Sequence, residues 1–278
     1  MKLKLKWLKV LTVALAMGSL VATGSQAAVT QLEGQAGGGI VPWALLSGGT
    51  PTASMTWVDT GDYTLSSLAV QGTLFKRVEL SYARLTFDTG HVGLGQVNVD
   101  AFGAKIKVLD MAAGFQPAVA VGVLYKKTDL DDNVLNAFGA DDSGTDFYVA
   151  ATKVFPVAGK NVLLNVTIRA TKANQIGILG FGGTDDDNYS AQAEGSLGVF
   201  LNKQTVLGVE YRMKPDNIKG VEEDDWADAF LAYFPNKNLS VVVAYAMLGD
   251  IAKATDIGQT GDAGKDQRGL YLQIQANF

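Results

Sequence analysis

Hydrophobic and polar residues alternate along most of the chain after residue 53. The final segment, 269–278, shows this period of two most clearly, because its even positions from Leu270 to Phe278 are apolar and its odd positions from Tyr271 to Asn277 are polar. In segment 161–171, aliphatic side chains share one face and Asn165, Thr167 and Arg169 share the other. This pattern is typical of β-strands that separate an apolar from a polar environment.

The alternation recurs between turn-forming residues and predicts twelve strands. They cover 54–60, 63–73, 77–87, 99–108, 117–127, 145–154, 161–171, 189–200, 205–213, 226–234, 239–248 and 269–278. Near residues 82–84 the alternation slips, which we interpret as a β-bulge.

The connections between these strands alternate in length. Those after the even-numbered strands are short, whereas five of those after odd-numbered strands are long: 88–98, 128–144, 172–188, 214–225 and 249–268. Only the first hairpin, around Gly61 and Asp62, departs from the alternation. Short periplasmic turns and long outer loops are the pattern of outer-membrane barrels. We therefore predict an all-β fold, a transmembrane antiparallel up-and-down β-barrel of about twelve strands over residues 53–278.

The first 52 residues do not share the alternation. Four lysines among residues 2–9, an apolar run over 10–16 and the small-residue site Ser25-Gln26-Ala27 predict a signal peptide over residues 1–27, cleaved after Ala27. Residues 28–52 are rich in glycine and have no strand periodicity. Their apolar centre contains the candidate plug residues Val41, Pro42, Trp43 and Leu45. Three placements are open for this segment: a plug in the lumen, a periplasmic tail, or a leader packed on the rim.

The last strand also carries a resemblance. Leu270, Leu272, Ile274 and the terminal Phe278 resemble the C-terminal signature by which the barrel assembly machinery recognises its clients in Gram-negative bacteria. Segments 37–46, 59–63, 78–84 and 87–90 together resemble a family of proteobacterial outer-membrane proteins of unknown function. The resemblance implies a barrel in the cell outer membrane, in contact with lipid and lipopolysaccharide. It supplies no catalytic residue and no substrate.

Composition excludes several functions. The formal net charge is −5 and no basic stretch occurs after the first nine residues, which argues against a nucleic-acid partner. The absence of cysteine excludes disulfides, zinc–thiolate sites, thiol nucleophiles and a lipid anchor on cysteine. We predict no cofactor, and the pattern specifies no oligomeric state.

Charged residues of both signs fall on the predicted inner face. The candidates for the lumen wall are Glu79, Lys105, Lys107, Lys126, Arg169, Glu194, Glu210, Arg212 and Asp228. One interpretation is a water-filled eyelet for small hydrophilic solutes. The other is an interior closed by salt bridges, with Glu210 and Arg212 as a candidate pair. Side chains fill eight-stranded barrels and sixteen strands leave an aqueous channel, so twelve strands permit either.

Two further features carry candidate chemistry. His91 is the only histidine, and barrel enzymes such as the outer-membrane phospholipase and lipid A deacylase families use a histidine with a serine. No serine follows His91 within several residues, so we predict no catalytic residue. Acidic runs at 129–132, 141–142, 185–187 and 222–225 lack the spacing of calcium-binding loops, and we interpret them as a hydrated surface without a metal site.

These observations favour a non-enzymatic outer-membrane barrel, either a narrow porin-like channel or a scaffold, for small hydrophilic solutes. The alternatives are a lipid-active enzyme that uses His91 at the outer leaflet and an interaction module of an export or matrix complex.

Overall fold

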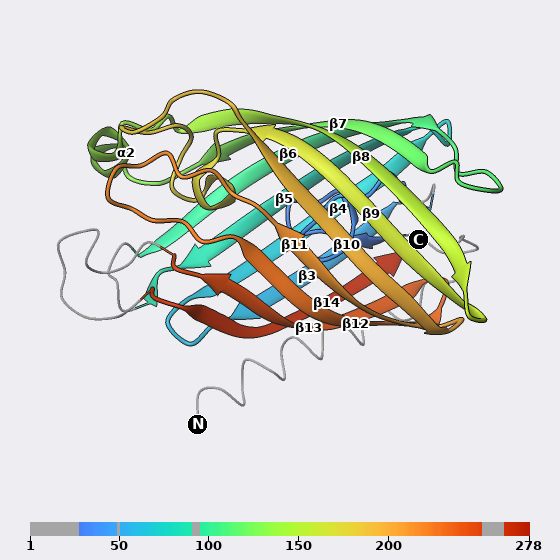
Figure 1. Cartoon of the computed structure of the whole chain (residues 1–278). Helices are drawn as coiled ribbons and strands as arrows, with labels where there is room; N and C mark the ends of the chain where they lie inside the picture. The colour runs from blue at the N-terminus through green and yellow to red at the C-terminus, as the bar shows by residue number, and fades with distance from the viewer. Residues whose placement is uncertain (1–27, 49–50, 91–94, 252–263) are drawn as a thin grey trace.

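The computed structural model describes residues 28–48, 51–90, 95–251 and 264–278. Twelve antiparallel strands form one closed barrel, in which each strand pairs with the next and the last pairs with the first (Figure 1). They are β3 (Thr52–Asp59), β4 (Thr64–Leu74), β5 (Val78–Asp88), β6 (Gln96–Leu109), β7 (Ala118–Thr128), β8 (Ser143–Val157), β9 (Lys160–Thr171), β10 (Ser190–Asn202), β11 (Thr205–Arg212), β12 (Trp226–Asn236), β13 (Leu239–Gly249) and β14 (Gln267–Asn277). The predicted all-β fold is confirmed. No helix within the described residues is long and apolar enough to cross a membrane.

The period of two separates the two faces of the barrel wall. In β9, Leu164 and Ile168 point outward and are 44% and 51% exposed, whereas Arg169 points inward and is 1% exposed. In β14, Leu270, Leu272 and Ile274 lie on the outer face, and the backbone N–H of Phe278 donates to the carbonyl of Pro51 at 2.9 Å. The outer face is apolar and the inner face is polar, which is the distribution of a barrel with hydrocarbon outside.

The predicted bulge near residues 82–84 is wrong. β5 pairs with β4 and β6 without a register shift, and Arg84 points outward. There its guanidinium pairs with Asp100 at 2.9 Å, and the Tyr82 hydroxyl donates to the same carboxylate at 2.6 Å. The alternation slips in the sequence because a small polar cluster lies on the outer face, where an apolar residue was expected.

The two ends of the barrel differ. At the end that we call the turn end, short connections join β4 to β5, β8 to β9, β10 to β11 and β12 to β13. At the opposite end, the loop end, the connections that follow β7, β9 and β11 fold over the mouth and include the helix α2 (Asp132–Phe138) and the 3₁₀ turn η3 (Asn174–Gly177). Apolar side chains of these loops are buried, among them Leu135, Ile178 and Phe181. The loops therefore cap the barrel.

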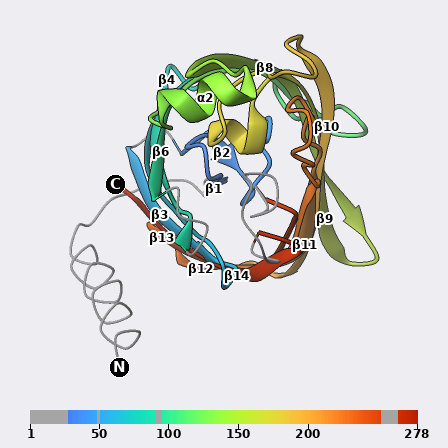
Figure 2. The same cartoon turned by 90° about the vertical axis from the view of Figure 1, so that its left-hand side faces the viewer.

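Residues 28–48 lie inside the barrel, and we call them the plug. Figure 2, which looks into the loop end, shows their short paired strands β1 (Val29–Thr30) and β2 (Ala36–Gly37) within the ring of wall strands. Nearly every plug residue is buried. Of the three placements open from sequence, the structure shows the segment in the lumen. The predicted signal peptide, residues 1–27, lies outside the described residues.

Candidate functional site

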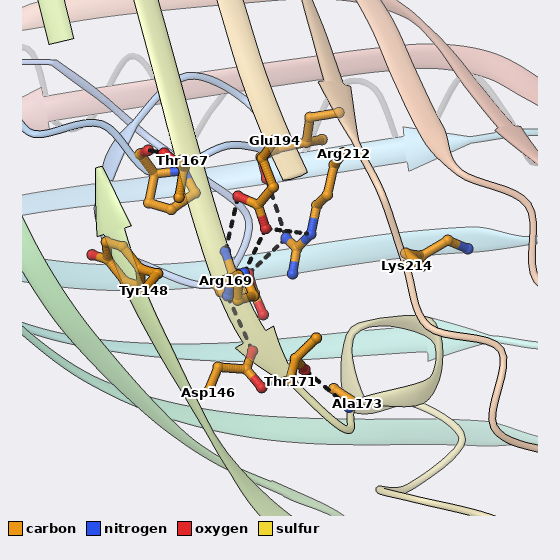
Figure 3. A network of polar contacts seen from close by, with 12 residues as sticks. Asp146, Tyr148, Thr167, Arg169, Thr171, Ala173, Glu194, Arg212 and Lys214 are labelled. Carbon is orange, nitrogen blue, oxygen red and sulfur yellow. Dashed lines mark hydrogen bonds and ion pairs between the residues drawn. The ribbon is translucent and has the colours of Figure 1, made fainter. Parts of the chain in front are cut away.

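Five neighbouring strands, β7 to β11, each contribute one charged side chain to a row across the lumen wall, and the sign alternates along this row. These residues, which we call the charge belt, are Lys126, Asp146, Arg169, Glu194 and Arg212. Arg169 lies at the centre, 3.0 Å from Asp146 and 2.5 Å from Glu194 (Figure 3). Lys126 Nζ lies 2.7 Å from Asp146, and Arg212 Nε lies 3.5 Å from Glu194. Each side chain of the belt is at most 3% exposed.

The plug supplies the carboxylate that completes the charge belt. Glu33 Oε1 lies 2.8 Å from Lys126 Nζ, and Glu33 Oε2 lies 2.7 Å from an Arg212 nitrogen and 3.4 Å from an Arg169 nitrogen. Glu33 stands in the tight turn between β1 and β2, where Gly34 has a φ of +95° that favours glycine. The belt alone has one more cation than anions, so Glu33 makes the cluster neutral.

A second buried ion pair holds the plug backbone. Glu79 on β5 and Lys105 on β6 lie 3.0 Å apart. The Glu79 carboxylate accepts hydrogen bonds from the backbone N–H groups of Ala36 at 2.9 Å and Ser47 at 2.7 Å. The Lys105 ammonium donates to the carbonyls of Ala36 at 2.7 Å and Leu45 at 2.9 Å. The pair therefore provides hydrogen-bond partners for buried backbone groups of the plug.

Hydroxyl and amide side chains of the wall hold the apolar part of the plug. Thr167 donates to the carbonyl of Pro42 at 2.8 Å, and the indole N–H of Trp43 donates to Ser196 at 2.8 Å. Val41, Pro42 and Trp43 are buried, and Leu45 is half-buried. The candidate plug residues thus lie against a polar wall and are held mainly through backbone and indole hydrogen bonds.

Within the described part of the chain, one acidic pair of the wall has no cation as an ion-pair partner. Glu210 on β11 and Asp228 on β12 are directly paired in register. Glu210 accepts hydrogen bonds from the backbone N–H of Ile40 at 2.9 Å and from Ser196 at 2.5 Å. Asp228 is 2% exposed, and neither of its carboxylate oxygens has a hydrogen-bond partner among the described residues. A Cβ on Gly38 would lie 1.9 Å from Glu210 Oε1, so a larger residue here would have to displace the Glu210 carboxylate.

The predicted pair of Glu210 with Arg212 is wrong. The Arg212 guanidinium is directed to Glu33 and Glu194 instead. Glu210 and Arg212 lie two residues apart and therefore share one face of β11. The carboxylate of Glu33 in the plug is nevertheless the closer partner of Arg212. The sequence pattern could not predict this contact, because it does not give the position of the plug.

We expect Asp228→Asn to raise the free energy of unfolding by roughly 1–3 kcal/mol, because burying an acidic group that has no partner opposite another carboxylate costs free energy. The matched control is Asp146→Asn, which removes a carboxylate that has two cation partners and is expected to destabilise the barrel. Denaturant unfolding in detergent measures both. Equal destabilisation by the two variants would contradict this assignment of charges.

A second buried polar cluster closes the loop end. Gln175 and Ile176 of η3 have φ values of 44° and 60°, a conformation that is strained for a β-branched residue. Glu223 accepts from the backbone N–H of Gln175 at 2.8 Å, and the Lys214 ammonium donates to the Gln175 side chain at 2.6 Å. Burial raises the pKa of Glu223 to about 7 and lowers the pKa of Lys214 to about 8.

The stability of this cap is expected to depend on pH. The Glu223 contribution is full below its ordinary pKa of 4.5 and is lost as the pH rises through about 7. The Lys214 contribution is full above 10.5 and is lost as the pH falls through about 8. The Gln175 amide should therefore exchange with solvent fastest, relative to its intrinsic rate, between these two pKa values. Glu223→Gln should remove the acidic limb of the profile in hydrogen-exchange mass spectrometry, and a profile unchanged in that variant would count against the account.

The remaining sequence candidates lie elsewhere. Lys107 is at the turn end, where its ammonium pairs with Asp110 at 2.7 Å. His91 lies outside the described residues. Among the residues that the structure describes, no three or more histidines and carboxylates are grouped so that they could hold a metal ion.

Sequence reasoning missed two members of the lumen cluster, Glu33 and Asp146. Glu33 is the only charged residue between positions 28 and 48, and this isolation in an otherwise uncharged segment was the available signal. Asp146 alternates with Tyr148 and Ala150 on the inner face of β8, so the period of two could have placed it there.

Comparisons with known proteins agree with this architecture. The KdgM porin is similar over 82% of this chain and 99% of its own, with 10% sequence identity and a TM-score of 0.50. The NanC porin is similar over 82% of this chain and 98% of its own, with 11% sequence identity and a TM-score of 0.49. The outer membrane phospholipase A from Escherichia coli is similar over 82% of this chain and 92% of its own, with 10% sequence identity and a TM-score of 0.43. No curated protein matches the chain. The likeness to the KdgM porin shows the fold alone.

The closed antiparallel barrel, with its apolar outer face and polar lumen, defines the fold of outer-membrane β-barrel proteins. The model of the family described as Protein of unknown function (DUF3034) matches residues 26–275. The chain belongs to this family.

Proposed function

We propose that this protein is a non-enzymatic channel of the Gram-negative outer membrane for small hydrophilic solutes, held closed by its plug. The observation that carries the proposal is the way in which the lumen is filled. A separate segment of the chain fills it, and the wall holds this segment through polar groups such as Glu79, Lys105 and Thr167. A wall of this kind suits water and polar solutes once the plug moves out.

The outer face and the terminal strand support the location. Leu270, Leu272 and Ile274 face outward beside Phe278, in the position expected of an assembly signal read by the barrel assembly machinery. Half-exposed tyrosines on the outer face, among them Tyr125, Tyr211 and Tyr245, suit the aromatic girdles at lipid interfaces. The long acidic loops would then face the medium, and lipid with lipopolysaccharide would surround the wall.

Solute flux tests the proposal. Vesicles that contain the chain from residue 28 onward are compared with vesicles that contain the barrel without residues 28–48. We expect the shortened barrel to admit a monosaccharide and the complete chain to admit it much more slowly. Equal, negligible flux through two correctly folded barrels would overturn the channel and favour a scaffold.

A further inference from the structure

Glu33 has the environment of a bound ligand. It is the only charged side chain of the plug, it is fully buried, and both of its carboxylate oxygens contact cations. Three cations from three different strands converge on it: Lys126, Arg169 and Arg212. Convergent charged donors from rigid strands are the usual construction of a carboxylate-binding site.

Part of this site is held by contacts within the wall. Asp146 and Glu194 each lie between two cations of the charge belt, so these ion pairs do not involve the plug. The Tyr148 ring lies 5.6 Å from the Arg169 guanidinium, and its hydroxyl donates to plug residue Gln35 at 2.7 Å. When the plug leaves, the belt has one uncompensated positive charge, and the Tyr148 hydroxyl loses its plug partner.

We propose that the charge belt is a binding site for small carboxylate solutes and that Glu33 is its built-in occupant. This inference rests on the proposed function, because a solute reaches the belt when the plug has moved. A small organic acid then competes with Glu33 for Lys126, Arg169 and Arg212. Glu210 lies two residues from Arg212 on the same face of β11 and pairs in register with Asp228. This acidic pair limits the positive region to one side of the lumen.

Chemical rescue of Glu33→Ala tests the site without any flux measurement. The substitution removes the two carbons and two oxygens beyond Cβ, which are the heavy atoms of acetate. We expect a saturable rise in the Tm of E33A as acetate replaces chloride at constant ionic strength. The wild-type chain, in which Glu33 occupies the site, should show no such rise. Acetamide, which has the same shape without the charge, should have no effect on E33A.

The double variant E33A/R212M is the matched control and should lose the response to acetate. If E33A does not fold in chloride, the refolding yield replaces the Tm as the readout, and acetate but not acetamide should restore it. Absence of any acetate effect, or an equal effect in E33A/R212M, would overturn the proposal and leave Glu33 as a structural anchor. Rescue by acetate together with a plug-free barrel that conducts nothing would instead retain the carboxylate site and reject the channel.

Discussion

Arg169→Met is expected to lower the free energy of unfolding by roughly 3–5 kcal/mol, the largest effect of any single substitution in the wall. Arg169 contacts Asp146, Glu194 and Glu33, so its removal leaves three buried carboxylates with fewer cations. Methionine has a similar length and needs no hydrogen bonds, which separates the loss of charge from a loss of packing. Denaturant unfolding of the folded barrel in detergent gives the value.

Arg77→Met is the control for this prediction. Arg77 also forms an ion pair, with Asp110 at 2.7 Å, but the side chains are 50% and 52% exposed at the turn end. An exposed pair contributes about 1 kcal/mol or less, so the control should have little effect. If both variants lose the same stability, the charge belt does not carry the energy assigned to it here.

Glu33→Lys is expected to drive the plug out of the lumen. The substitution places a fourth cation among Lys126, Arg169 and Arg212 and replaces the only group that compensates their surplus charge. A buried cluster with a surplus of two positive charges is unstable, whereas these charges would be hydrated if the plug moved into water. We expect chymotrypsin to cleave after Trp43 in the plug of E33K at many times the rate for the wild-type chain, while the barrel itself stays intact.

Glu33→Gln separates charge from shape in the same assay. Its amide keeps the size of the side chain and can accept hydrogen bonds through one oxygen, so cleavage should be intermediate between the wild-type chain and E33K. A plug in E33K as resistant to chymotrypsin as in the wild-type chain would show that the three cations do not control its position.

The wall of the barrel could be predicted from the sequence because its physical cause is local. An outer face in hydrocarbon and an inner face in a polar lumen impose a period of two on every strand, and this placed Arg169, Glu194 and Asp228 on the inner face. The lengths of the connections then predicted the order of the strands around the barrel, in which each strand pairs with its neighbour in the chain. Arg84 departs from this pattern because it pairs with Asp100 of the neighbouring strand on the outer face. The alternation within a single strand does not reveal such a partner.

The partners within the lumen could not be predicted in the same way. Glu210 and Arg212 share a face, yet each bonds to the plug, at Ile40 and Glu33. Which partners Glu210 and Arg212 bind depends on where residues 28–48 lie in three dimensions. This segment has no sequence periodicity from which its position against the wall could be predicted. The cap at Gln175 was missed for a related reason, since its partners come from two other loops, Lys214 and Glu223 from the one after β11 and Asp250 from the one after β13.

The central claim, that residues 28–48 fill a closed lumen, is tested most directly by the reactivity of a cysteine at Thr30. The chain has no cysteine of its own, and Thr30 is 1% exposed inside the barrel. We predict that Thr30→Cys in the folded protein does not react with a membrane-impermeant maleimide, and that it reacts fully in the background of Glu33→Lys. Labelling of Thr30→Cys in the otherwise unchanged chain, as fast as a cysteine placed at exposed Asn202, would contradict the claim.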